Sequence, residues 1–445
     1  MTPALEDLFA VLRFASISTD SNHVADVRAC AQWYVEKFQT MGLEVELCET
    51  AQHPIVLAKN KAVTGRKTVL IYGHYDVQPV DPVELWDSAP FEPVIKDGKI
   101  WARGSTDNKG QHMAHLLGVE ETLKEKGELP VNLIFLLEGE EEIGSPNLPA
   151  FLEERKEELV CDVIAVSDTG MVAPGVPTLG YGLRGITCCE VKVTGPDKDL
   201  HSGVYGGAVA NPATAAAQLI GSLHDQEGQV AVAGFYDEVE PLADWEREMW
   251  AEVPGMGKDE LLEVTGAPEL FGEVGYSSAE RLWARPTCEV NGMWGGYQGE
   301  GSKTVLPAEA GFKLSCRLVP AQDPEVILER VKVHLEEHLP AGVQMKFVAG
   351  HSGKAYVADP HSEAGKAAQL ALEEVFGKAP VLIREGGSIP IIQSMKEILG
   401  TDSLMLGLAL PDCQIHSPNE NFTVENFEAG IRLNRVLLEK LGELA

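Results

Sequence analysis

Four glutamates gather directly behind an apolar run in the stretch "LIFLLEGEEEIGSPN". The run, residues 133–137, has the pattern of a buried strand, so the carboxylates emerge at a strand end. Like charges this close repel, and one group would take up a proton unless a cation binds among them. The stretch is therefore either a solvated acidic turn or a cation site; its glutamates are Glu138, Glu140, Glu141 and Glu142.

Other apolar runs also lead to residues that can bind a metal. "TVLIYGHYDVQP" places His74 and Asp76 just beyond a strand, and "VIAVSDTG" places Asp168 after another. Asp107 lies in the loop "WARGSTDNKGQ", and His416 lies in "LPDCQIHSPNEN". Ligands bind outside the carboxyl ends of strands in open α/β sheets, so we expect these side chains to converge. A set of histidines and carboxylates without thiolates suits zinc, manganese or cobalt.

Each of these residues also has a purely structural interpretation. A loop histidine can simply be hydrogen-bonded, and Asp107 can cap the helix that follows it. Asp168 can be a turn residue, and the glutamates can be a solvated turn. Together the residues favour metal-assisted hydrolysis, because two ions about 3.5–4 Å apart activate a water and polarise a carbonyl. A free glutamate beside that water would complete the site.

The elements that would hold these residues have an α/β pattern. The runs 68–72, 131–137 and 163–167 are apolar throughout, which is typical of strands buried on both faces. Helical patterns over 110–126 and 148–156 lie between the later runs. We therefore predict an α/β fold with a mainly parallel sheet.

The pattern changes after "GYGLRG". "ITCCEVKVTG" and "EAGFKLSCRLVP" have the alternation of strands with one wet face, and a helix is expected at 324–339. The α/β pattern resumes with helices near 362–376 and 424–441. We predict a smaller α+β domain, residues 184–354, inserted into a larger domain, residues 1–183 and 355–445.

Length and composition limit the classes of function. A chain of 445 residues favours two domains, and its net charge of −32 disfavours nucleic acid and anionic membrane surfaces as partners. No run approaches the roughly 18 apolar residues of a membrane span. "MTPALEDLFAVLRFASIST" lacks the apolar core of a secretory signal, and the eight cysteines show no CxxC spacing. We predict a cytoplasmic protein with neither a nucleic-acid nor a membrane partner.

Nine motifs occur in order along almost the whole chain: "GHYDVQP", "RGSTDNKG", "EGEEEIGS", "SDTG", "DLHSGVYGG", "KTVLP", "CRLVP", "REGGS" and "IHSPNEN". Together they resemble the two-metal peptidase family that includes acetylornithine deacetylase, aminoacylase and carnosinase. "DLHSGVYGGAVANP" and "RLVP" are most similar to its cytosolic nonspecific dipeptidase branch. The larger domain would then be catalytic, and the inserted domain would be a lid and dimerisation domain.

The resemblance implies two divalent ions per subunit, zinc or manganese, with cobalt as a further option. One ion would be bound by His74 and Asp168, and the other by Glu142 and His416. Asp107 would bridge the two ions.

The same resemblance assigns the residues around the ions. Glu141 would be the general base on a water that bridges the ions, and Asp76 would orient the imidazole of His74. The peptide after the bridging aspartate is typically cis in this family, here Asp107–Asn108. Asn108 stands where many members of the dipeptidase branch carry aspartate, and we expect little consequence for metal binding.

Substrate contacts are also implied. Arg317 in "CRLVP" resembles the arginine that clamps the substrate's terminal carboxylate. Thr304 in "KTVLP" and Ser388 in "EGGS" match residues of the same pocket. His201 in "DLHSG" resembles a histidine that, in dimeric members, reaches the neighbouring subunit's active site and stabilises the oxyanion. His351 in "GHSGKAY" would be another contact.

Several polar residues receive a structural interpretation. "HLEEH" (334–338) spells an inverted zinc motif, but it lies on an amphipathic helix with no third ligand evident. His112 and His115 are expected to pack behind the site. Glu138 and Glu140 keep the interpretation of solvated turn residues.

The predicted function is metal-dependent hydrolysis of the peptide bond of dipeptides or short peptides, by a homodimer that forms through the inserted domain. The alternative within the family is an N-acyl amino acid deacylase. A metal-loaded but inactive binding module is the alternative from another class.

Overall fold

The computed structural model describes residues 1–387 and 389–444. These residues form two compact units. The first comprises Met1–Tyr181, Ala358–Ile383 and Ile391–Ala445, and the second comprises Gly182–Val357 and Arg384–Pro390. The chain therefore enters the second unit twice, and we describe each unit by itself.

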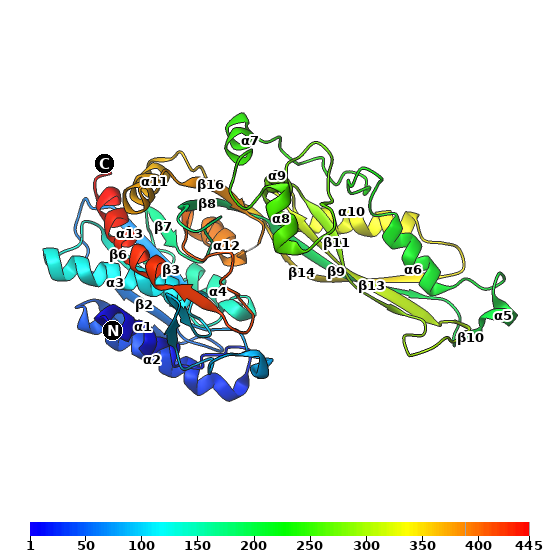
Figure 1. Cartoon of the computed structure of the whole chain (residues 1–445), viewed down its shortest axis with the longest axis horizontal. Coiled ribbons are helices and arrows are strands. Elements are labelled where there is room, and N and C mark those ends of the chain that lie inside the picture. Colours follow the sequence, from blue (N-terminus) through cyan, green and yellow to red (C-terminus); the bar gives the residue numbers. More distant parts are fainter. Residues whose placement is uncertain (388, 445) are drawn as a thin grey trace. The chain divides into compact units, whose positions relative to one another are not determined.

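A nine-stranded sheet lies mostly in the first unit, and its strand β15 belongs to the residues of the second (Figure 1). Its order is β1-β2-β6-β3-β7-β17-β8-β15, and β16 pairs with β8. In that order the strands are β1 (Glu44–Cys48), β2 (Ile55–Lys59), β6 (Asn132–Glu138), β3 (Thr68–His74), β7 (Val163–Val166), β17 (Ser403–Gly407), β8 (Thr178–Leu183) and β15 (Tyr356–Val357), with β16 at Val381–Glu385.

The centre of this sheet confirms the predicted α/β class. The pairs β6–β3, β3–β7 and β7–β17 are parallel, and their strands are buried over almost their whole length. The pairs of β1 with β2, β2 with β6, and β8 with β17 and β15 are antiparallel. The sheet is therefore mixed, and its parallel centre brings several strand ends to one edge.

The helices predicted at 110–126, 148–156, 362–376 and 424–441 are present in this unit. Helix α2 (Val24–Thr40) packs on β1 and β2, and α3 (Lys109–Lys126) packs on β3. Helix α13 (Val424–Gly442) lies against α3 and also contacts α11 (Glu363–Phe376) (Figure 1). The remaining helices of this unit include α1 (Pro3–Leu12), α4 (Leu148–Glu154) and α12 (Pro390–Leu399).

Two buried histidines fix α3 behind the strand ends. The Nε2 atom of His112 lies 2.6 Å from the hydroxyl of Tyr34. His115 lies between Ser167, whose Oγ is 2.7 Å from Nε2, and Asn434, whose amide nitrogen is 2.9 Å from Nδ1. Burial lowers the pKa of His115 to about 4, so this side chain is neutral near pH 7. The predicted packing role of both histidines is confirmed.

A small three-stranded sheet joins two loops that are distant in the sequence. Its order is β18-β5-β4, with β18 at Asn421–Thr423, β5 at Lys99–Trp101 and β4 at Val94–Lys96. Strand β5 leads into the loop of Asp107, whereas β18 follows the loop of His416. The antiparallel pairing of β5 with β18 therefore brings the two loops together.

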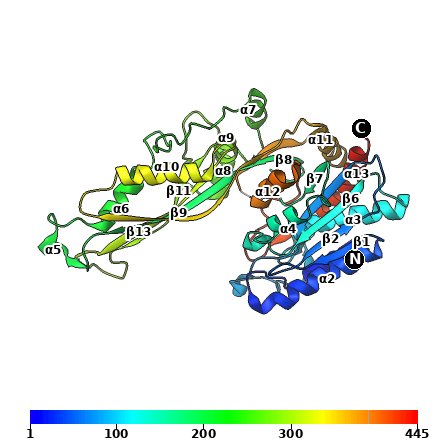
Figure 2. The same cartoon turned by 180° about the vertical axis from the view of Figure 1, so that it is seen from behind.

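The second unit contains a four-stranded antiparallel sheet in the order β11-β13-β9-β14. Helices α6 (Pro212–Gly221) and α10 (Pro324–Glu337) pack on the sheet, and their apolar residues share one core with it (Figure 2). Burial of each such apolar side chain contributes about 1.5–3 kcal/mol. The strands are β11 (Thr287–Gly295), β13 (Glu309–Leu318), β9 (Gly185–Thr194) and β14 (Gln344–Gly353).

Shorter elements complete this unit. Strand β10 (Leu200–His201) pairs with β12 (Val305–Leu306) and leads into α5 (Ser202–Tyr205). The remaining helices of this unit are α7 (Asp244–Trp250), α8 (Lys258–Thr265) and α9 (Ser278–Ala284).

Among the helices of the described residues, none is both long and apolar enough to cross a membrane.

Candidate metal centre and active site

Five side chains from separate segments of the first unit meet at the carboxyl ends of the parallel strands. Nε2 of His74 lies 3.1 Å from one oxygen of Asp107 and 3.8 Å from Asp168. Nε2 of His416 lies 2.9 Å from the other oxygen of Asp107 and 3.3 Å from Glu142. Asp107 therefore lies between the two histidines, with one carboxylate oxygen facing each.

These distances suit a cation that would lie among the ligands. One ligand atom each of His74, Asp107 and Glu142 lies within 4.8 Å of the others. Oε1 of Glu142 is buried and has no hydrogen-bond partner among the described residues. A buried polar atom normally has a partner, so this atom fits the role of a metal ligand. The ligand roles of the five residues stay predictions.

The electrostatics of the centre also favour a cation. Burial acts to lower the pKa of His74, but hydrogen bonds with Asp107, Asp168 and Asp76 outweigh it and raise this pKa well above its usual value. Hydrogen bonds with Asp107 and Glu142 raise the pKa of His416 to about 10. The surrounding carboxylates thus favour positive charge at both imidazoles. A divalent cation would supply that charge.

Glu141 lies in the same charged surroundings. Burial raises its pKa well above the ordinary carboxyl value, and the carboxylates of Asp168, Asp107 and Glu142 raise it further, while His74 acts in the opposite direction. A basic, desolvated carboxylate is suited to accept a proton.

Asp76 fixes two parts of the site at once. Its carboxylate oxygen lies 3.4 Å from Nδ1 of His74, and its main-chain oxygen lies 3.1 Å from the same atom. The carboxylate also accepts hydrogen bonds from the main-chain N–H groups of Glu141 (3.2 Å) and Glu142 (3.0 Å). Asp76 thereby orients the imidazole and anchors the start of the glutamate turn.

The peptide bond between Asp107 and Asn108 is cis, as the resemblance implies. The side-chain amide of Asn108 donates to Asp168 (2.7 Å) and to the main-chain oxygen of Ser167 (2.6 Å). Its oxygen lies 3.1 Å from Nδ1 of His112. An aspartate at this position has no amide to donate to Asp168, so the asparagine contributes a hydrogen bond that the sequence did not reveal.

Glu420 holds the Asp107 loop, and the sequence analysis missed it. This carboxylate is fully buried and accepts hydrogen bonds from the main-chain N–H groups of Gly104 (2.9 Å), Thr106 (2.8 Å) and Asp107 (3.0 Å). Arg103 compensates its charge at 2.8 Å. One feature of the sequence could have pointed to Glu420: it is an acidic residue inside the "IHSPNEN" motif, four residues after His416.

The prediction that Glu138 and Glu140 are solvated turn residues is wrong. Glu138 is 1% exposed and accepts hydrogen bonds from the hydroxyls of Tyr72 (2.6 Å) and Ser145 (2.8 Å). Glu140 is 2% exposed and accepts hydrogen bonds from the main chain of His53 and the side chain of Asn147. Neighbouring segments cover both residues, so they support the turn from inside.

Four of the five predicted substrate contacts are described residues of the second unit. His201 and Thr304 are exposed neighbours at the β10–β12 pair, because Ser202 N–H donates to the main-chain oxygen of Thr304. Arg317 on β13 and His351 on β14 flank β9 from its two sides. Ser388 lies outside the described residues, and the roles of all five stay predictions.

The "HLEEH" segment forms no cluster of metal ligands among the described residues. His334 and His338 stack on each other, and Nε2 of His334 lies 3.0 Å from the main-chain oxygen of Ser222. The segment lies on α10, with Leu335 in the core.

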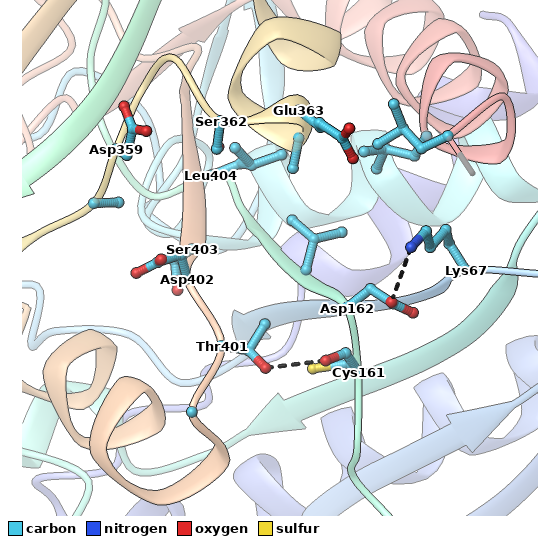
Figure 3. A pocket seen from close by; sticks show the side chains of 16 residues that line it. Lys67, Cys161, Asp162, Asp359, Ser362, Glu363, Thr401, Asp402, Ser403 and Leu404 are labelled. Carbon is cyan, nitrogen blue, oxygen red and sulfur yellow. Dashed lines mark hydrogen bonds and ion pairs between the residues drawn. The ribbon is translucent and has the colours of Figure 1, made fainter.

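A separate cavity of about 470 Å³ lies at the other end of the central strands. Lys67, Asp162 and Asp402 immediately precede β3, β7 and β17 and contribute to its wall (Figure 3). Lys67 contacts Asp162 at 3.5 Å, and Thr401 donates to the main-chain oxygen of Cys161 (Figure 3). No histidine is among the described residues that line this cavity, so it differs in kind from the metal centre.

Comparison with known proteins agrees with this geometry. The model of "Peptidase family M20/M25/M40" matches residues 70–440. The chain belongs to this peptidase family. The resemblance found in the sequence is thereby confirmed.

Named relatives of this peptidase cover most of its length. The Cys-Gly metallodipeptidase dug1 of Schizosaccharomyces pombe is 32% identical over 97% of this chain and 94% of its own. The Beta-Ala-His dipeptidase of Mus musculus is 33% identical over 85% of this chain and 78% of its own. The solved structure of the M20 family metallo-carboxypeptidase Sso-CP2 from Sulfolobus solfataricus is 34% identical, with a TM-score of 0.87 and full coverage of both chains.

The buried pair of Glu420 and Arg103 predicts a measurable effect on this peptidase. Replacement of Glu420 by Gln leaves the arginine buried without its counter-charge, which should reduce the free energy of unfolding by about 3–5 kcal/mol. Because the Asp107 loop loses its anchor, metal affinity should fall by about 10–100-fold. Chemical denaturation of the metal-free protein and a metal titration measure the two effects.

Glu439→Gln is the matched control, because Glu439 forms an exposed ion pair with Lys126. An exposed pair contributes at most about 1 kcal/mol. If Glu420→Gln behaves like this control in both measurements, the anchoring role of Glu420 is wrong.

Proposed function

We propose that this protein is a dinuclear metallo-dipeptidase that hydrolyses the peptide bond of dipeptides or short unblocked peptides. The observation that carries the proposal is the cluster in which Asp107 lies between His74 and His416, with the half-buried Glu141 next to the ligand Glu142 in the chain. The relatives named dipeptidases, which match almost the whole chain, support the same reaction.

The donor set supports two divalent ions, zinc or manganese, with cobalt as a further option. We propose that one ion is held by His74 and Asp168, that the other is held by Glu142 and His416, and that Asp107 contributes to both. When bound, the ions would activate a water and polarise the substrate carbonyl.

The side chains perform the remaining steps of the proposed mechanism. Glu141 accepts a proton from the attacking water and returns it to the leaving amine. Asp76 keeps the imidazole of His74 in place during this transfer, and Arg317 binds the terminal carboxylate of the peptide. Thr304, Ser388 and His351 are proposed as further substrate contacts.

Replacement of Glu141 tests the assignment of the base. Glu141→Ala should retain the metal ions, because the five ligands remain, but turnover should fall by about 10²–10⁴-fold. Metal content and kcat on a dipeptide measure the two properties. Glu153→Ala, which removes an exposed glutamate from α4, is the control and should keep the wild-type rate. A Glu141→Ala variant with near wild-type kcat would refute the proposed role.

Substrate choice separates this proposal from its rivals. After metal reconstitution, Ala-Gly should be cleaved faster than N-acetyl amino acids or unblocked peptides of five residues. Activity restricted to the acetylated substrates would identify a deacylase. Release of single residues from the longer peptides would favour a carboxypeptidase, the activity in the name of a similar solved protein. Bound metal with no hydrolysis would indicate a binding module.

We also propose a cytoplasmic homodimer that forms through the second unit, in which His201 acts in the active site of the neighbouring subunit. The exposure of His201 on the short β10 strand supports this role, because its ring is accessible to a second chain. Native mass measurement should give twice the mass of one chain. His201→Ala should lower kcat without loss of metal; a native mass equal to one chain would contradict the proposal.

A further inference from the structure

The second unit contains a cavity of about 430 Å³ with an unusual charge balance for so acidic a protein. Four arginines line it, whereas its wall contains two glutamates. The arginines therefore exceed the acids by two charges. They are Arg184, Arg281, Arg285 and Arg317, and the acids are Glu273 and Glu289.

One arginine of this cavity is already neutralised. Arg285 forms two hydrogen bonds with the carboxylate of Glu273, at 2.7 and 2.6 Å. Its guanidinium also lies over the rings of Tyr236 and Tyr276. Arg285 is thus fixed in a structural pair, and it offers little charge to a ligand.

Arg184 is in the opposite situation. It is 9% exposed, and its guanidinium donates to the main-chain oxygens of Gly386 (2.9 Å) and Arg285 (3.3 Å). Within the described part of the chain it forms no ion pair with a carboxylate. Burial and the charge of neighbouring Arg317 lower the pKa of Arg184 to about 10. A buried guanidinium that has only carbonyl partners is stabilised by an anion.

Arg281 adds a second charge of the same kind. Its side chain donates to the main-chain oxygens of Glu273 (2.8 Å) and Phe271 (3.4 Å). Glu289 is exposed at the same wall and offsets part of the positive charge. The lining therefore contains two more arginines than glutamates, and a ligand with two carboxylates would balance this excess.

We propose that this cavity binds the two carboxylates of an acidic C-terminal residue, with Arg317 on the terminal carboxylate and Arg184 on the side-chain carboxylate. Arg184 is then a specificity-determining residue, and the substrate class is peptides that end in aspartate or glutamate. This assignment rests on the proposed peptidase function, through the role of Arg317. A planar guanidinium suits such a carboxylate because it can donate two parallel hydrogen bonds.

The test compares kcat/KM for Ala-Glu and for Ala-Gln, which has the same shape without the side-chain charge. The wild-type enzyme should prefer Ala-Glu by about 10–100-fold, the usual effect of a charged hydrogen bond. Arg184→Met should remove this preference by slowing Ala-Glu alone. Arg184→Lys should keep part of the preference for Ala-Glu, because lysine retains the positive charge but cannot donate two parallel hydrogen bonds to one carboxylate. Lys346→Met, which removes an exposed cation of β14 outside the cavity, should leave the preference unchanged.

Binding of glutarate, compared with glutaramate by calorimetry, gives a readout that does not need catalysis. Wild type should bind glutarate at least tenfold more tightly, and Arg184→Met should bind both equally. If no dipeptide is hydrolysed but this difference holds, the proposed function fails and the acidic-ligand site stands.

Two outcomes overturn the inference: equal wild-type rates on Ala-Glu and Ala-Gln, or an equal loss on both substrates in Arg184→Met. The second outcome would place Arg184 on the common terminal carboxylate or in the fold. If Arg184→Met does not fold, Arg184→Lys decides, and an undiminished preference in that variant also overturns the inference.

Discussion

Repulsion among carboxyl groups is the constraint on which the first unit depends. Asp107, Glu142 and Asp168 meet around two imidazoles, and the half-buried Glu141 interacts electrostatically with them. At an effective dielectric constant of about 20, two like charges about 4 Å apart repel by about 4 kcal/mol. The repulsion energy of a few such pairs would equal the whole free energy of unfolding of a typical domain, about 5–15 kcal/mol. Positive charge inside the cluster would stabilise it, and divalent ions bound among these ligands would supply that charge.

The protein uses other buried acids to hold the loops that carry the cluster. Asp76 accepts the N–H groups at the start of the glutamate turn, and Glu420 accepts those that lead to Asp107. Glu140 likewise accepts a hydrogen bond from the main-chain N–H group of His53. Main-chain donors are rigid and carry no mobile side chain, so each such carboxylate fixes a loop at low entropic cost. His416 has a positive φ of 58°, a conformation uncommon outside glycine, and the anchor at Glu420 lies only four residues away.

The sequence predicts the cluster better than its supports. Apolar runs such as 68–72 and 163–167 mark central strands, because strands buried on both faces need apolar side chains throughout. Histidine and carboxylate residues at the ends of these strands then indicate the candidate metal centre. Strand β1 was not predicted, since its exposed and charged residues obscure the pattern. Glu138, Glu140 and Glu420 were misread or missed for a related reason: local charge does not reveal which distant segment will cover a residue and donate hydrogen bonds to it.

Net charge is a poor guide to what a single cavity binds. The chain carries −32 charges, yet the cavity beside Arg184 and Arg317 is positive. The Debye length is about 8 Å at physiological ionic strength, so distant surface acids are screened whereas groups in the wall act directly. Each unit therefore sets its own local field: acids dominate around Asp107 and attract cations, and arginines dominate in the cavity and attract carboxylates.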